Sequence, residues 1–361
     1  MPELTSPLTL RTVQIKNRLV MPPMVLFKKE GTWKPDASHL EYYARRARAG
    51  VGLIIVEATS VSPEGRLAPF QLRAWDDAHV EALAPIARAI KTSGAVALIQ
   101  LHHAGANTHL AATEGATLVS PSGVPVNKTE SARRALTPEE ICALVACFAA
   151  AAQRCIQAGF DGVELHGAHG YLLSQFLSPL TNRRTDGWGG PTVRERLAFP
   201  LAVARAVRGV IGPRPLLGYR LGIADYAAGG LPLAEGIEAA GILAGTGYLD
   251  LLHVSNGLSG VHRPLPPADF EFSQLLWLGA QAKAAVDLPV IAVGGIRTGA
   301  EARRVLSRNH ADLVAVGKAM LADPDWPAKA LAGQDDAIRT CLICPRCAHF
   351  EPERRCAAWG T

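Results

Sequence analysis

Eight short apolar runs, each followed by an amphipathic stretch, constrain the fold of this 361-residue chain more than any other feature. The runs are rich in β-branched residues and almost continuously hydrophobic, which is typical of parallel strands buried on both faces. They cover residues 19–22, 52–57, 97–101, 162–165, 216–220, 249–254, 289–293 and 311–316. Strands and helices that alternate eight times predict an α/β fold, a single (β/α)8 TIM barrel.

The segments between and around these runs fill in the expected organisation. Helices are predicted over residues 78–90, 138–156, 193–210, 233–244 and 300–306. Thr137 and Thr298 each stand three residues before a glutamate, which indicates helix starts. Residues 8–16 alternate like a small hairpin that would plug the barrel, and the Pro/Gly/Ser-rich residues 117–131 predict a lid-type loop. The barrel is expected to span residues 1–335, with residues 336–361 as a Cys-rich extension of the same domain.

Charge and hydropathy argue against several classes of partner. The net charge of +5 is spread along the chain in doublets, which predicts solvated faces and no nucleic-acid partner. No apolar run is long enough to span a bilayer, and the N-terminus lacks the pattern of a secretion signal. Cys142, Cys147 and Cys155 fall in one apolar helix pattern and are expected to act as small buried hydrophobes. We therefore expect a cytoplasmic protein without a membrane partner, and homo-oligomerisation is left open.

Polar residues gather where the predicted strands end. Such residues stand at or just after the C-terminal end of six predicted strands: Gln100, His103, His166, His169, Arg220, Asn256, Gly295 and Lys318. Barrels of this kind carry out their chemistry at that face. The sequence therefore predicts a single site built from these strand ends.

The segment 164–190 carries the most specific chemistry. It presents His166, His169 and Tyr171 within six residues, and two imidazoles with a phenol can hold a polarised oxygen and deliver a proton. The segment resembles the H-x-x-[HN]-x-Y signature of the Old Yellow Enzyme family of flavin-dependent ene-reductases. The resemblance implies that the two histidines hold the substrate oxygen and that Tyr171 gives the proton. It implies reduction of activated C=C bonds (α,β-unsaturated carbonyl, maleimide or nitro compounds) with NAD(P)H.

A site for FMN can be assembled from the strand ends. Glycine loops after the seventh and eighth strands suit a phosphate, because glycine lets backbone N–H groups approach it. The residues expected there are Gly294, Gly295, Gly317 and Lys318. Gln100 and Arg220 suit the ring of the flavin, since a cation stabilises its reduced, anionic form. The family resemblance extends from about residue 5 to about residue 335, and it implies that Pro22, Pro23, Met24 and Ala58 line the flavin.

Several positions depart from the family pattern. Lys318 stands where the family commonly has arginine, so charge is kept but the bidentate fork is lost. Val25 replaces a Cys or Thr of many members, and Phe27 replaces a tyrosine of some. Phe27 is expected to contact substrate. So is His262, because a similar loop histidine assists proton delivery in the dienoyl-CoA reductase branch; an exposed loop histidine is the alternative for that residue.

The C-terminal tail carries Cys341, Cys344, Cys347 and Cys356. Spacings of three residues between the first three suggest a metal site. The tail resembles the four-cysteine [4Fe–4S] site of the 2,4-dienoyl-CoA reductase branch, with shorter spacings. An iron–sulfur cluster, a zinc ion, and free or disulfide-linked thiols all stay open here.

Three alternatives accompany the prediction of an FMN-dependent ene-reductase. One is a dienoyl-CoA reductase-like enzyme with FMN and a cluster, acting on an enoyl substrate. Another is a metal-dependent barrel hydrolase or lyase that would use His103, His166 and His169 as ligands, although those strand ends lack the usual carboxylates. The third is a flavin-binding protein without catalysis. The sequence does not choose between NADH and NADPH.

Overall fold

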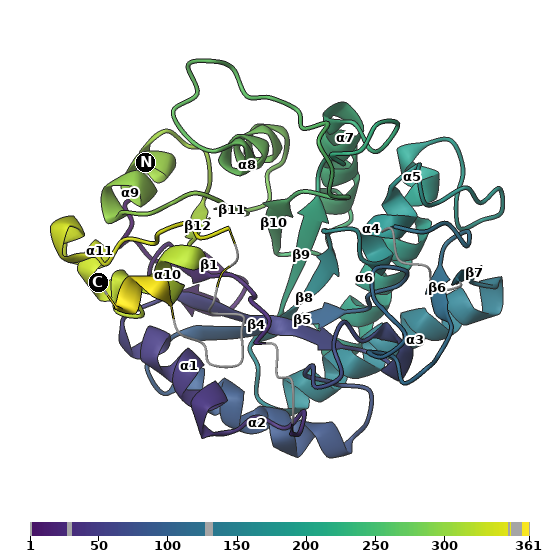
Figure 1. Cartoon of the computed structure of the whole chain (residues 1–361), viewed down its shortest axis with the longest axis horizontal. Helices are drawn as coiled ribbons and strands as arrows, with labels where there is room; N and C mark the ends of the chain where they lie inside the picture. The colour runs from purple at the N-terminus through teal and green to yellow at the C-terminus, as the bar shows by residue number, and fades with distance from the viewer. Residues whose placement is uncertain (1, 27–30, 127–132, 346, 348–355, 361) are drawn as a thin grey trace.

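The structure, a computed structural model, describes residues 2–26, 31–126, 133–345, 347 and 356–360 (Figure 1). Its centre is a closed barrel of eight parallel strands, hydrogen-bonded in the order β10-β11-β12-β3-β4-β5-β8-β9. These strands are β3 (Leu19–Met21), β4 (Leu53–Ser60), β5 (Val96–His102), β8 (Gly162–Gly167), β9 (Leu216–Gly222), β10 (Leu251–Ser255), β11 (Val290–Val293) and β12 (Leu313–Ala315). All eight predicted strands are confirmed, and so is the (β/α)8 fold.

Helices surround the strands, as Figure 1 shows. They are α1 (Ala37–Arg48), α2 (Ala78–Lys91), α3 (Pro138–Gln157), α4 (Leu172–Leu177), α5 (Val193–Arg196), α6 (Ala198–Ile211), α7 (Leu233–Ala244), α8 (Gln274–Ala285), α9 (Gly299–Ser307), α10 (Lys318–Ala322) and α11 (Trp326–Leu331). Thr137 and Thr298 both form capping boxes, as their sequence context predicts. The helix predicted over 193–210 is divided at Leu197 into α5 and α6. Among the described helices, none is long and apolar enough to cross a membrane.

The lower part of the barrel interior is apolar. Leu53, Leu98 and Leu216 meet there with other inward side chains of the strands. The hairpin of β1 (Leu8–Leu10) and β2 (Val13–Ile15) adds Leu10 and Ile15 to the same cluster. The predicted plug is therefore confirmed, and it closes the end of the barrel opposite the polar strand ends.

An irregularity in β4 changes which side chains point into the barrel. The pairing of β4 with β5 shifts between Val56 and Thr59, so one residue is left over in β4. Glu57 consequently faces outward, where its carboxylate meets His39 and Tyr43 of α1 at 2.7 and 3.2 Å. By the alternation of a strand, Ala58 then faces inward.

The long connection between β5 and α3 has more regular structure than a lid-type loop. It contains β6 (Leu118–Ser120), which pairs with β7 (Arg133–Ala135) in a separate two-stranded sheet. Leu118 and Val119 are buried, and this burial explains why three residues of the connection form a strand. The prediction of a lid over 117–131 is therefore wrong for this part, and residues 127–131 lie outside the described residues.

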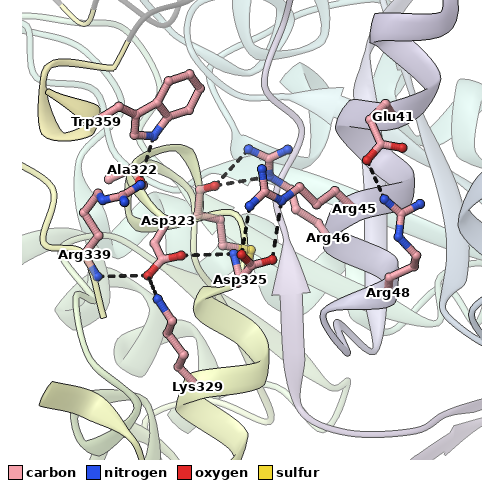
Figure 2. A network of polar contacts seen from close by, with 11 residues as sticks. Glu41, Arg45, Arg46, Arg48, Ala322, Asp323, Asp325, Lys329, Arg339 and Trp359 are labelled. Carbon is pink, nitrogen blue, oxygen red and sulfur yellow. Dashed lines mark hydrogen bonds and ion pairs between the residues drawn. The ribbon is translucent and has the colours of Figure 1, made fainter. Parts of the chain in front are cut away.

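The C-terminal segment lies against the last two helices (Figure 2). Asp323, at the end of α10, accepts bonds from the backbone N–H of Arg339 at 2.9 Å and from Nζ of Lys329 at 2.6 Å. A short 3-10 helix, η4 (Ala357–Trp359), follows, and Nε1 of Trp359 donates to the carbonyl of Ala322 at 2.9 Å. The tail is thus held next to the segment that begins with Gly317 and Lys318.

Candidate active site

The end of β8 turns sharply into α4, and this turn presents the three predicted site residues. Val163 and Leu165 belong to the outer core, so Glu164 and His166 face the barrel interior. His169 has a φ of 59°, a left-handed conformation that is uncommon for a residue with a side chain. Its N–H donates to the carbonyl of Asn256 at 2.9 Å, which ties the turn to the segment after β10.

The predicted pair of histidines forms one hydrogen-bonded chain. Nε2 of His166 lies 3.3 Å from Nδ1 of His169, and Nε2 of His169 lies 2.7 Å from Oγ of Ser255. Burial lowers the pKa of His166 and of His169 well below the ordinary value, and nearby basic groups lower both further. Both imidazoles are therefore neutral at physiological pH, and each can donate only one N–H.

Tyr171 stands beside this chain. Its ring centroid is 4.9 Å from that of His166 and 4.4 Å from that of His102, in edge-to-face contacts. Burial raises the pKa of Tyr171 to about 12, so the phenol keeps its proton across the physiological range. A phenol in this state can donate its proton but cannot take one up.

A second layer of polar groups lies one step deeper in the barrel. Glu164 is fully buried; Nε2 of Gln100 donates to its Oε1 at 2.7 Å, and Nδ1 of His253 lies 2.9 Å from its Oε2. Arg220 pairs in register with both His166 and His253. Burial lowers the pKa of Arg220, while the Glu164 carboxylate acts against that shift. Gln100 and Arg220, both predicted, thus share one cluster with Glu164 and His253, which the sequence reasoning did not place in the site.

The residues predicted to line a flavin surround the mouth of the barrel. Pro22 and Met24 follow β3 and lie next to the loop after β12: a Cβ on Gly317 would be 3.4 Å from both Cγ of Pro22 and Sδ of Met24. Ala58 faces inward because of the shift in β4. The buried Glu57 carboxylate accepts from the N–H of Leu26 at 2.9 Å and so holds the segment that contains Pro22, Pro23 and Met24.

The glycine loop after β11 has a backbone that lets N–H groups approach a phosphate. Gly294 and Gly295 have φ values of 123° and 76°, which side chains rarely allow. A Cβ on Gly294 would lie 2.7 Å from Cβ of Leu275. Lys318 is exposed at the start of α10. Nε of Arg220 is buried and finds no hydrogen-bond partner among the described residues. These residues fit FMN, since an orphaned cationic donor and an open glycine turn are what its ring and phosphate need.

The predicted substrate contacts Phe27 and His262 and the alternative metal site do not join this cluster in the described part of the chain. Phe27 is outside the described residues. His262 is exposed in the loop after β10, where its N–H donates to the carbonyl of Tyr226 at 2.8 Å. His103 turns toward Glu64, with Nε2 3.8 Å from Oε1. Among the described residues, no three His, Cys, Asp or Glu side chains are placed to hold a metal ion, so the arrangement gives no support to a metal-dependent hydrolase.

The four tail cysteines are half-buried and carry free thiols. Burial raises the pKa of Cys356, and Cys341, Cys347 and Cys344 raise it further, so each of these three thiols lies within electrostatic reach of Cys356. Ile343 has a φ of 51°, a strained conformation for a β-branched residue. In the described part of the tail the thiols are near each other without forming a metal-binding geometry.

Comparisons with known proteins agree with this geometry. The profile of the NADH:flavin oxidoreductase / NADH oxidase family matches residues 3–337. An NADH oxidase of Thermoanaerobacter brockii is 39% identical, over 95% of this chain and 53% of that protein. An NADPH dehydrogenase of Bacillus licheniformis is 39% identical, over 91% and 94%. A solved complex of 2-naphthoyl-CoA reductase with 2-naphthoyl-CoA is 26% identical with a TM-score of 0.87, over 97% of this chain and 56% of that one. The chain therefore spans about half the length of two of these proteins and most of the third.

Proposed function

Because the chain belongs to the NADH:flavin oxidoreductase / NADH oxidase family, to which its Old Yellow Enzyme motifs pointed, we propose that it is an FMN-dependent NAD(P)H oxidoreductase that reduces activated C=C bonds. The observation that carries this proposal is the juxtaposition of His166, His169 and Tyr171 directly above the Gln100–Glu164–Arg220 cluster. When bound, FMN would accept a hydride from NAD(P)H and pass it to the β-carbon of the alkene.

The proposed task of the two histidines is to hold the substrate oxygen. Their facing nitrogens are 3.3 Å apart, so one oxygen can lie within ordinary hydrogen-bond length of both. Donors that are held in place before the reaction stabilise the negative charge that grows on this oxygen. Substrates would be α,β-unsaturated carbonyl, maleimide or nitro compounds, because each has an acceptor oxygen conjugated to the alkene.

The proposed task of Tyr171 is to protonate the α-carbon. Its pKa of about 12 keeps the phenol protonated, and its ring is fixed against His102 and His166. Arg220 and Gln100 would hold the flavin ring, and Gly294, Gly295, Gly317 and Lys318 its phosphate. Pro22, Pro23, Met24 and Ala58 would line the ring. Phe27 and His262 stay proposed substrate contacts.

The test is a comparison of flavin reoxidation by cyclohexenone in wild-type protein and in the His166→Ala/His169→Ala double variant. Loss of two hydrogen bonds to charge that develops in the transition state should slow reoxidation at least about a hundredfold. Flavin reduction by NAD(P)H is the internal control and should change much less. A double variant that reduces cyclohexenone at the wild-type rate would show that the substrate oxygen is held elsewhere.

A second candidate is a dienoyl-CoA reductase-like enzyme that acts on an acyl-CoA-type enoyl substrate. It is favoured by the four neighbouring thiols of the tail and by the strained Ile343 between two of them. The similarity to 2-naphthoyl-CoA reductase supports the same candidate. In it, the tail would hold a [4Fe–4S] cluster or a zinc ion. Residues 336–361 would then be an extension of the barrel domain formed by residues 1–335, as the contact of Trp359 with Ala322 also suggests.

A further inference from the structure

The hydrogen bonds around His166 determine which of its nitrogens carries the proton. The backbone N–H of Ala168 donates to Nδ1 of His166 at 3.3 Å. A nitrogen that accepts such a bond must present its lone pair, so the single proton of the neutral ring is on Nε2. That N–H points at Nδ1 of His169, 3.3 Å away.

The hydrogen bond from His166 in turn determines which nitrogen of His169 carries the proton. Nδ1 of His169 accepts from His166, so the proton of the neutral His169 ring is on Nε2. This N–H lies 2.7 Å from Oγ of Ser255, which accepts it. Ser255 is the last residue of β10, is 2% exposed, and is brought to His169 from 86 residues away in the chain.

This tautomer of His169 is the wrong one for holding an oxygen together with His166. A substrate oxygen between the two rings can accept from Nε2–H of His166 but meets the lone pair on Nδ1 of His169. Two donors are present only if His169 carries its proton on Nδ1. Nε2 of His169 is then an acceptor and needs a donor, which a hydroxyl can become by rotation about its C–O bond.

We propose that Ser255 is a positioning residue that holds His169 in either neutral tautomer, and that its change from acceptor to donor accompanies binding of the substrate oxygen. The proposal rests on the function proposed above. One proton leaves Nε2 and one is taken up at Nδ1, both exchanged with water, so the ring stays neutral and no net proton is consumed. Ser255 acts through His169 and need not touch the substrate.

The backbone of the turn restricts the change to hydrogen positions. The N–H of His169 is bound to the carbonyl of Asn256, and its carbonyl accepts from Nδ2 of Asn107 at 3.1 Å. Because its backbone N–H and carbonyl are both hydrogen-bonded, His169 keeps its ring in place while Ser255 changes from acceptor to donor. A side chain at position 255 that only accepts or only packs could not serve both tautomers.

The experiment records ring ¹⁵N shifts of histidine-labelled, flavin-loaded protein by NMR, because the two neutral tautomers give different shifts. Cyclohexanone serves as the probe, since it offers the oxygen without a reducible alkene. In wild-type protein without cyclohexanone, His169 should carry its proton on Nε2. After cyclohexanone is added, the proton should be on Nδ1. Ser255→Thr keeps a hydroxyl and should behave alike, whereas Ser255→Ala should show averaged shifts in both conditions. Ser60→Ala is the matched control: this buried hydroxyl, at the end of β4, donates to the carbonyl of Ser62 at 2.8 Å.

Steady-state kinetics separate this proposal from the function on which it rests. Ser255→Ala should raise KM for cyclohexenone about tenfold and change kcat less, as expected for one lost hydrogen bond in the substrate site. If wild-type protein does not reduce alkenes, the proposed function is wrong. The ring ¹⁵N shifts of His169 then still test whether Ser255 holds its two tautomers. Identical ring shifts in wild-type and Ser255→Ala protein, with or without cyclohexanone, would overturn the proposal.

Discussion

Replacing Glu164 by alanine should destabilise the barrel strongly, because it removes the one carboxylate of the interior polar cluster. Two hydrogen bonds, to Gln100 and to His253, are lost. Arg220, which is 7% exposed, would then be a buried cation without its anion. Leaving a buried charge uncompensated costs about 3–5 kcal/mol of unfolding free energy.

The expected loss of unfolding free energy corresponds to a fall in the melting temperature, Tm. Unfolding entropy of about 2.1 cal/mol/K per residue gives roughly 0.8 kcal/mol/K for 361 residues, so Glu164→Ala should lower Tm by about 4–7 °C. Thermal unfolding should be followed by circular dichroism in flavin-free protein, because bound flavin adds its own stabilisation. Glu164→Gln is the matched variant: its amide can still accept from Gln100 and donate to His253, so it loses only the charge. Because both variants remove the charge, Glu164→Gln should show most of the drop seen for Glu164→Ala. A drop below about 2 °C for Glu164→Ala would refute the reasoning, and a drop below about 2 °C for Glu164→Gln alone would show that the two hydrogen bonds, rather than the charge, stabilise the cluster.

Three further predictions concern the flavin site and the tail. Gly294→Ala should weaken FMN retention in equilibrium dialysis, because the φ of Gly294 is 123° and an added Cβ would approach Leu275. Gly247→Ala is the control: Gly247 also has a positive φ, but a Cβ there would have no atom within 4 Å, so this variant should retain FMN as wild type does. Arg220→Ala should raise the Kd for FMN by tenfold or more, because the buried cation is lost; an unchanged Kd would remove Arg220 from the site. Anaerobically purified Cys344→Ser protein should contain less metal than wild type. Its Tm should be clearly lower, whereas its rate of alkene turnover should change little. Finding neither iron nor zinc in wild-type protein, with four titratable thiols, would contradict a metal site.

The barrel could be predicted because its signal is local. Each strand is a short apolar run, and the helices α2 and α3 have their apolar residues mainly on one side. Helix α8 was not predicted, because in the sequence Gln274–Ala285 apolar residues are not confined to one face. The irregularity in β4 was also missed, since it depends on pairing with β5 rather than on the residues of β4 alone.

The site could be predicted where its residues stand together in a motif or, like Gln100 and Arg220, at the end of a predicted strand. His166, His169 and Tyr171 are such a set, and the structure brings them together. Glu164 stands in the same segment, inside a run of residues that predicts a buried strand. A carboxylate inside an apolar run is the signal that could have found it. Ser255 gives no such signal, because a serine at a strand end is ordinary and its partner His169 is brought to it only by closure of the barrel.

The most direct test of the proposed chemistry is the rate at which reduced, flavin-loaded Tyr171→Phe protein passes its electrons to an alkene and to a quinone. Only the alkene needs a proton placed on carbon, whereas the oxygens of a quinone can take protons from water. Loss of the phenol should therefore slow reoxidation by cyclohexenone about a hundredfold or more and leave reoxidation by a quinone within about threefold of the wild-type rate. Equal losses with both acceptors would mean that Tyr171 only packs in the site, and would contradict its role as the proton donor.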